Sequence, residues 1–156
     1  MIRLLLTLVL LAVAGLMAWV RLAPTDAERW HTDPFATPSP GEGGWKIAPG
    51  GDDAPPVFEA SPEEVLAALD EIALATPRTE RLAGSVESGR ITYETRSRIM
   101  GFPDYTTVAA HAGQEGTEIA ILARLRFGQG DMGVNRARAE DWLARLRESI
   151  DRGPGT

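Results

Sequence analysis

The chain has 156 residues, of which 44% are hydrophobic and 24% are charged, and it carries a net charge of −6 and no cysteine. This balance is typical of a globular protein and excludes full disorder. The absence of cysteine excludes disulfides, thiolate metal sites, iron–sulfur clusters and thiol nucleophiles. The negative charge argues against a basic nucleic-acid-binding or membrane-surface protein, and His31 and His111 lie too far apart to suggest a multi-histidine metal site. We therefore expect no metal and no other cofactor.

Residues 1–23 are predicted to be a transmembrane anchor. The uncharged run over residues 4–20, flanked by Arg3 and Arg21, would span about 26 Å as a helix, close to the ~30 Å hydrocarbon core of a bilayer. A cleaved signal peptide is the alternative, but small residues are lacking where cleavage needs them; a buried core helix is a third reading. The charge distribution weakly favours a cytoplasmic N-terminus. We therefore expect a single-pass protein of the bacterial inner membrane with its C-terminal domain in the periplasm.

Residues 24–56 are predicted to be a Pro/Gly-rich acidic tether. They contain seven prolines, five glycines and six acidic residues against two basic ones. Such a segment buries too little apolar surface to offset the entropy lost on ordering. Trp30, Phe35 and Trp45 stand out from this composition, and we expect packing roles for them. Trp30 would lie at the bilayer interface, and Trp45 would dock on the domain.

The segment over residues 57–151 has the pattern of a folded domain. A short edge strand is expected at 57–59. A helix over 62–75 is predicted from Ser61 at the N-cap, Pro62 at the first helical position and Glu64 at the third, followed by an apolar stripe. Apolar residues then predict four strands, over residues 80–87, 91–100, 105–112 and 117–127. A last apolar stripe predicts a helix over residues 135–150.

These elements predict an α+β fold. Short loops between successive strands favour antiparallel pairing, and two helices with one apolar face each must cover one side of the sheet. We expect an antiparallel sheet of four to five strands in the order strand–helix–four strands–helix, preceded by one transmembrane helix and followed by a flexible tail over 152–156. The uncovered face of the sheet would carry Arg96, Arg98, Arg124 and Arg126.

A glycine-rich turn over residues 128–133 matches the dinucleotide-binding pattern G-x-G-x-x-G. That motif also needs a second parallel strand and an acidic residue about 20 positions further on. Only 23 residues follow Gly133, and they are taken up by the last helix and the tail. We therefore expect no nicotinamide or flavin binding.

The same turn leads into the N-terminus of a helix, which suits an anion. Arg126, Arg136 and Arg138 lie close by in the sequence, and arginine side chains bind carboxylates and phosphates well. In the alternative reading, the glycines make a tight turn, Asn135 caps the helix and the arginines are solvated. Asp131 is equally well placed to pair with one of these arginines.

Other motifs give weaker signals. The pattern Asp131-x-Gly133-x-Asn135 lacks most of a calcium-binding loop. His111 has no nearby cysteine or paired carboxylate in the sequence, which favours a structural role. No G-x-S-x-G, P-loop or H-E-x-x-H pattern occurs in the chain.

Two segments carry a pattern in the same order and spacing as a known family. Residues 95–104 read T-R-S-R-I-M-G-F-P-D, and residues 130–136 read G-D-M-G-V-N-R. They resemble the family called domain of unknown function 1499, over about residues 57–147. The chain departs from that family by lacking an asparagine–cysteine segment before the first helix and by reading L-A-R-L-R at 122–126. The resemblance implies the domain but no mechanism, and the matching positions are Arg96, Arg98, Gly101, Phe102, Asp104, Arg126, Asp131, Gly133, Asn135 and Arg136.

From these patterns we expect a non-enzymatic, membrane-anchored envelope domain that binds a protein partner or a small anionic ligand. The predicted ligand-binding residues are Arg96, Arg98, Arg126, Asp131, Gly133, Asn135 and Arg136. The alternative is a hydrolase-like enzyme in which Asp104 or Asp131 acts as general base and the arginines stabilise a developing anion. A purely structural spacer in an envelope complex is a third reading.

Overall fold

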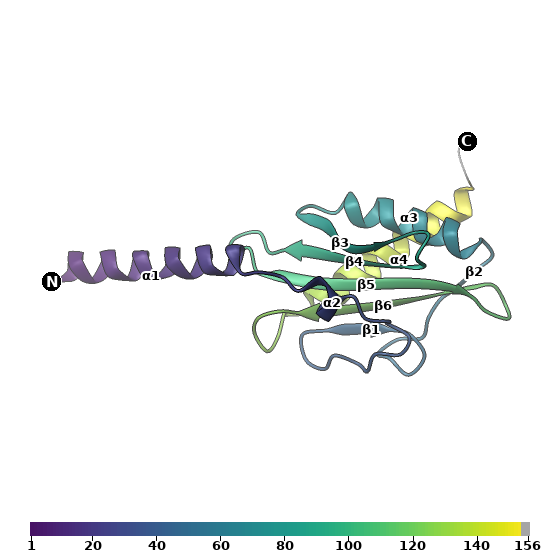
Figure 1. The fold of residues 1–156 in the computed structure, drawn as a ribbon, viewed down its shortest axis with the longest axis horizontal. Coiled ribbons are helices and arrows are strands. Elements are labelled where there is room, and N and C mark those ends of the chain that lie inside the picture. The colour runs from purple at the N-terminus through teal and green to yellow at the C-terminus, as the bar shows by residue number, and fades with distance from the viewer. Residues whose placement is uncertain (154–156) are drawn as a thin grey trace.

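The computed structural model describes residues 1–153, and it places one long helix beside a two-layer α+β domain (Figure 1). The predicted tail lies mostly outside the described residues, and Arg152 still belongs to the last helix. The elements in chain order are α1 (Ile2–Leu22), α2 (Ala27–Trp30), β1 (Trp45–Ile47), β2 (Val57–Phe58), α3 (Pro62–Leu74), β3 (Thr79–Ser85), β4 (Arg90–Arg96), β5 (Pro103–Ala112), β6 (Thr117–Leu125) and α4 (Val134–Arg152).

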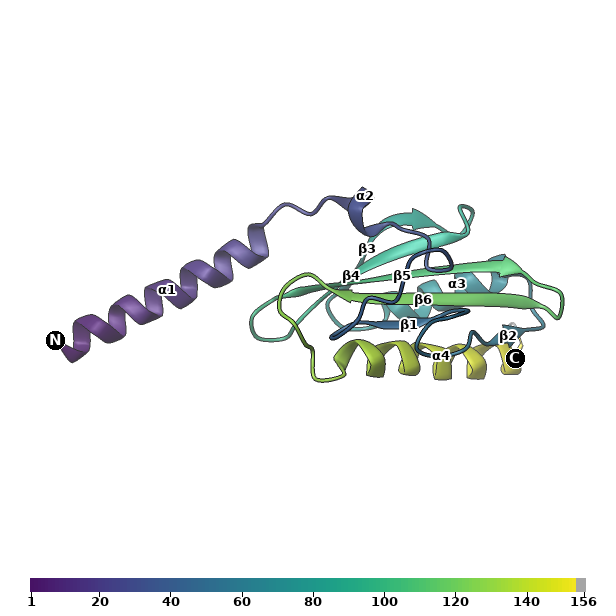
Figure 2. The same ribbon diagram turned by 90° about the horizontal axis from the view of Figure 1, so that it is seen from below.

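The sheet is antiparallel, with β1, β6, β5, β4 and β3 in spatial order and β2 also paired with β6. The two helices α3 and α4 pack on one face of this sheet, and the predicted α+β fold is confirmed (Figure 2). The sheet has six strands rather than the four to five expected, because β1, which lies in the segment expected to be a tether, also pairs with β6. Ile91, Val108, Ile119 and Ile121 point toward the helices because side chains alternate between the two faces of a strand.

The core between the helices and the sheet is centred on Trp142 of α4. Its ring meets Tyr93 edge-on with 5.5 Å between ring centroids, and its Nε1 donates to Thr76 Oγ1 over 2.9 Å. The hydroxyl of Tyr93 donates to Asp70 Oδ1 over 2.8 Å, and Arg81 pairs with the same carboxylate. Helix α3 begins with the capping box that the sequence predicts. Buried aromatic rings thus keep their polar atoms hydrogen-bonded.

Three strands end earlier than the sequence predicts, and the first of them, β3, ends at Ser85 rather than at residue 87. Strand β4 ends at Arg96, because the next residues form a turn in which the Gly101 N–H donates to the Ser97 carbonyl over 3.2 Å and Gly101 has a φ of 75°. Arg98 therefore lies in a loop, and its predicted place on the sheet face is wrong. Strand β6 ends at Leu125 rather than at residue 127.

Helix α1 extends away from the domain, with its last turn in contact with it (Figures 1 and 2). It could be a membrane anchor or a signal sequence, since it is the one helix of the described chain that is long and apolar enough to cross a membrane. Val20 is buried, and the Trp19 ring lies 5.6 Å from that of Phe127. Arg21 donates to the Ile99 carbonyl over 3.2 Å, and a Cβ on Gly101 would lie 2.7 Å from Arg21 Nε.

The structure differs from the tether expected over residues 24–56. Residues 23–37, which we call the strap, cross the face of the sheet that the two helices leave open (Figure 2). Further along, β1 pairs with β6 and places Trp45 opposite Ala123, which agrees with the expected docking of Trp45. The segment is therefore ordered against the sheet despite its proline and glycine content.

Aromatic stacking holds the strap on the sheet. The Trp30 ring stacks on Tyr105 at 4.2 Å between centroids, and Phe35 contacts His111 at 4.0 Å, so both rings have packing roles. His31 Nδ1 lies 2.9 Å from Thr92 Oγ1, and burial together with the nearby Arg90 lowers the pKa of His31. These contacts cover the sheet face that we expected to be open and to carry Arg96, Arg98, Arg124 and Arg126.

Candidate functional site

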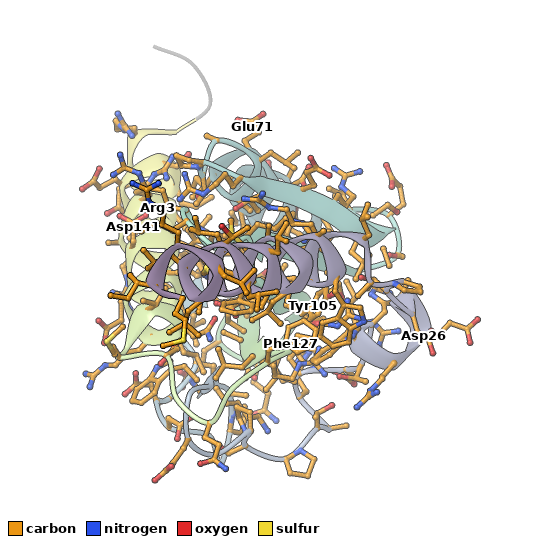
Figure 3. The ribbon with its side chains drawn as sticks, turned by 90° about the vertical axis from the view of Figure 1, so that its left-hand side faces the viewer. Arg3, Asp26, Glu71, Tyr105, Phe127 and Asp141 are labelled. Atoms are coloured by element: carbon orange, nitrogen blue, oxygen red, sulfur yellow. The ribbon has the colours of Figure 1, made fainter. Side chains whose placement is uncertain are left out.

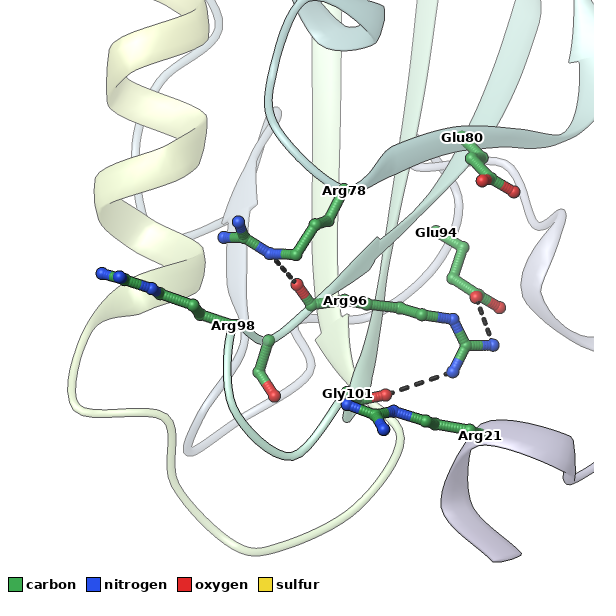
Figure 4. A pocket seen from close by; sticks show the side chains of 8 residues that line it. Arg21, Arg78, Glu80, Glu94, Arg96, Arg98 and Gly101 are labelled. Carbon is green, nitrogen blue, oxygen red and sulfur yellow. Dashed lines mark hydrogen bonds and ion pairs between the residues drawn. The ribbon is translucent and has the colours of Figure 1, made fainter. Parts of the chain in front are cut away.

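The motif residues meet where the β4–β5 loop, the start of β5 and the first turns of α4 come together. Between them lies a pocket of about 380 Å³, which we call the arginine groove. A second pocket of about 260 Å³ lies on the other side of residues 96–98 and shares part of this lining (Figure 4). The arginine groove is lined by Thr76, Pro77, Arg78, Thr95, Arg96, Ser97, Arg98, Asp104, Val134, Arg138, Asp141 and Trp142.

Four arginines line these pockets: Arg78, Arg96 and Arg98 line both of them, and Arg21 lines only the smaller one. In Figure 4, which shows the smaller pocket, the side chains of Arg78 and Arg98 point toward α4, whereas those of Arg96 and Arg21 lie on the opposite side. Arg96 forms an ion pair with Glu94 at 2.6 Å and donates to the Gly101 carbonyl. Within residues 1–153, neither Arg78 nor Arg98 forms an ion pair. The groove therefore has two guanidinium groups without a carboxylate partner.

The inner wall of the groove is a buried arginine–carboxylate pair. Arg138 is only 8% exposed, and its Nη2 lies 3.6 Å from Asp104 Oδ2. The same guanidinium donates to Asn135 Oδ1, while its Nε is buried without a hydrogen-bond partner in the described structure. Burial raises the pKa of Asp104 to about 6, with Arg138 opposing and Asp131 reinforcing that rise. Burial also lowers the pKa of Arg138.

Three motif residues build the turn before α4 and hold it in place. Asp131 accepts the Gly133 N–H over 2.9 Å with one carboxylate oxygen and the Asn135 N–H over 2.5 Å with the other. Gly133 has a φ of 82°, which few other residues tolerate. Asn135 is buried, lies inside α4 rather than at its N-cap, and donates to the Gly43 carbonyl over 2.8 Å. These residues support the groove without lining it.

The other two predicted arginines lie away from the groove. Arg126 donates to the Pro24 carbonyl over 2.7 Å and to Thr25 Oγ1 over 3.0 Å, so its partners are neutral groups of the strap. Arg136 pairs with Glu140 at 2.7 Å and stacks over the Trp45 ring at 4.6 Å. Of the four arginines predicted to bind a ligand, the structure brings only Arg96 and Arg98 to the same region.

Sequence reasoning missed Arg78 and gave Arg138 no specific partner. Arg78 lies in the turn between α3 and β3 with a φ of 61°, and its Nε donates to the Arg96 carbonyl over 2.9 Å. No local pattern places that turn beside the β4–β5 loop. For Arg138 there was a signal, because it follows Asn135 by one helical turn and therefore lies on the same face of α4.

The comparisons with known proteins give a family but no activity. The model of the family described as "Protein of unknown function (DUF1499)" matches residues 35–146, so the match begins within the segment expected to be a tether. No curated protein matches the sequence.

Three solved structures are similar in part. A protein from Chromobacterium violaceum is 16% identical, with a TM-score of 0.49, over 70% of this chain and 98% of that one. One from Mesorhizobium loti is 12% identical, with a TM-score of 0.46, over 65% of this chain and 97% of that one. An uncharacterized protein from Rhizobium leguminosarum is 17% identical, with a TM-score of 0.47, over 70% of this chain and 94% of that one. None of these likenesses bears on function.

Proposed function

The chain belongs to the DUF1499 family, and from the geometry of its arginine groove we propose that it is a membrane-anchored domain that binds a small anionic group between Arg78 and Arg98. One observation carries this proposal: two arginines that form no ion pair within the described residues line the same pocket of about 380 Å³. Guanidinium groups bind phosphates and carboxylates through paired hydrogen bonds. The buried Arg138 adds a third positive charge, which Asp104 partly offsets.

We place the protein in the inner membrane of a bacterium, with α1 retained and the domain in the periplasm. The charge on Arg3 supports a cytoplasmic N-terminus. The contacts of the last turn of α1 support its retention, because cleavage after residue 23 would remove Trp19, Val20 and Arg21 from the domain. Intact mass measurement of the protein extracted from membranes tests this placement.

Changing both Arg78 and Arg98 to glutamine is expected to weaken anion binding at least ~10-fold, since each lost charge-assisted hydrogen bond is worth about 1.5–3 kcal/mol. Binding would be measured by calorimetry on the full chain in zwitterionic micelles, with inorganic phosphate, methyl phosphate and succinate. A bound ligand also raises the free energy of unfolding, by about 2.7 kcal/mol at 100 times its Kd.

The matched control is Arg147→Gln, because Arg147 is exposed on α4 and lines neither of the two pockets. This control should bind like the unmodified chain. If none of the three anions binds, or if the double variant binds them as tightly as the control does, the proposal is wrong.

A hydrolase-like enzyme is the second candidate, and one observation favours it. Asp104 lines the groove and has its pKa raised to about 6, which suits a general base near neutral pH. Asp131 is less suited, because both of its carboxylate oxygens accept backbone N–H groups. Turnover of phosphate or carboxylate esters that is lost in Asp104→Asn, with anion binding retained, would establish this function.

A further inference from the structure

Two loops at the end of the domain where α1 emerges expose large apolar side chains. They are residues 97–102, between β4 and β5, and residues 127–133, between β6 and α4, and we call them the rim loops (Figure 1). Ile99 is 76% exposed and Met132 is fully exposed. Few large apolar side chains of the described domain are exposed, and the others are Val57, Leu74 and Val134. Apolar side chains that protrude from one end of a domain indicate a contact surface.

Helix α1 fixes what that surface faces. Its last turn contacts both rim loops, through the hydrogen bond from Arg21 to the Ile99 carbonyl at 3.2 Å and the approach of Trp19 to Phe127 at 5.6 Å. Figure 3 faces this end of the domain, and α1 lies in front of its middle. A helix that crosses a bilayer and ends on these loops brings them to the bilayer surface.

Charge at the same end matches a phospholipid surface. Arg21, Arg78 and Arg98 line the two pockets that flank residues 96–98. The rim loop over 97–102 contains no acidic residue, and the other contains only Asp131, which caps the turn before α4. Arginines beside exposed apolar residues suit the boundary between lipid headgroups and acyl chains.

We propose that the rim loops lie in the surface of the membrane that holds α1, with Ile99 and Met132 among the headgroups, and that the anion in the arginine groove is the phosphate of a phospholipid of that leaflet. This inference rests on the proposed function, because it identifies the anion that Arg78 and Arg98 bind. A bilayer accounts for the exposed apolar residues, the arginines and the end of α1 together.

The absence of cysteine allows a direct test with single labels. The full chain carrying Ile99→Cys or Met132→Cys, labelled with the fluorophore NBD, is placed in nanodiscs of phosphatidylcholine alone or with about a third of phosphatidylglycerol. The control is Glu115→Cys, an exposed position in the β5–β6 hairpin at the opposite end of the domain. Labels at 99 and 132 should emit at shorter wavelength and be quenched at least ~2-fold more by shallow doxyl lipids than the label at 115.

A second measurement separates a lipid phosphate from free phosphate. In zwitterionic micelles, a short-chain phosphatidylglycerol should bind the full chain at least ~10-fold more tightly than inorganic phosphate, and the double change of Arg78 and Arg98 to glutamine should remove this binding. Labels at 99 and 132 that behave like the label at 115 would overturn the membrane contact and leave the surface to a protein partner. Equal binding of the two phosphates would overturn the lipid assignment, while phosphate binding itself would still uphold the proposed function.

Discussion

Replacing Asp104 with asparagine is expected to remove about 3 kcal/mol of pH dependence from the free energy of unfolding between about pH 4 and pH 7. Burial raises the pKa of Asp104 from 3.8 to about 6 in the folded protein, and the side chain is 15% exposed. The folded state therefore holds this proton more tightly than the unfolded state does. The resulting stabilisation is fully present below pH 3.8 and is lost as the pH rises through about 6.

Urea unfolding of the full chain in micelles, followed by tryptophan fluorescence at several pH values, measures this difference. The matched control is Asp141→Asn, because Asp141 lies on the same groove but is 60% exposed and only 3.7 Å from Arg145. The control should follow the pH dependence of the unmodified chain. If the curve for Asp104→Asn also runs parallel to that of the unmodified chain, Asp104 is not buried as the structure places it.

Local sequence signals predicted helices α1, α3 and α4 and the central strands of this fold. Ser61, Pro62 and Glu64 form the expected capping box, which depends only on residues within one helical turn. The alternation along β6 placed Ile119 and Ile121 in the core in the same way. Such elements are predictable because the interactions that select them connect neighbours in the chain.

The strap could not be predicted, because its partners come from distant parts of the chain. The Trp30 ring stacks on Tyr105, and the Trp30 carbonyl accepts hydrogen bonds from Thr107 and Arg124 on two neighbouring strands. Composition indicates how much apolar surface a segment can bury by itself. It does not include the aromatic rings and hydrogen-bonding groups that a neighbouring sheet provides. The order of residues 23–37 is therefore a tertiary effect.

The candidate site shows a similar limit. The pattern R-S-R placed Arg96 and Arg98 on one strand face, but the turn at Gly101 moves Arg98 into a loop beside Arg78. Among the motif positions, Asp131 and Asn135 hold backbone groups. A family pattern thus combines residues that shape a site with residues that line it, and the sequence does not separate the two.

Arg124 connects the strap to the sheet through several hydrogen bonds at once. Its guanidinium donates to Thr32 Oγ1 over 3.0 Å, to Thr107 Oγ1 over 2.9 Å and to the Trp30 carbonyl, and it lies 5.2 Å from the centre of the Trp30 ring. Burial lowers the pKa of Arg124 to about 10, so the group remains charged at neutral pH. A buried cation that binds backbone and hydroxyl oxygen atoms makes strong hydrogen bonds, and its removal leaves those oxygen atoms unpaired.

Changing Arg124 to methionine is therefore expected to release the strap while the sheet beneath it stays folded. Amide hydrogen exchange of the full chain should speed up about 30-fold in residues 23–34, which corresponds to about 2 kcal/mol of local stability. Amides of the β4–β5 ladder should change much less, because α3 and α4 cover the other face of those strands. Arg147→Met, at an exposed position of α4, is the control and should leave the exchange of the strap unchanged. Equal acceleration in the strap and in the β4–β5 ladder would mean that Arg124 stabilises the whole domain. Unchanged exchange would mean that the strap is held by its other contacts, among them the stacking of Trp30 and Phe35 and the hydrogen bonds from Arg126.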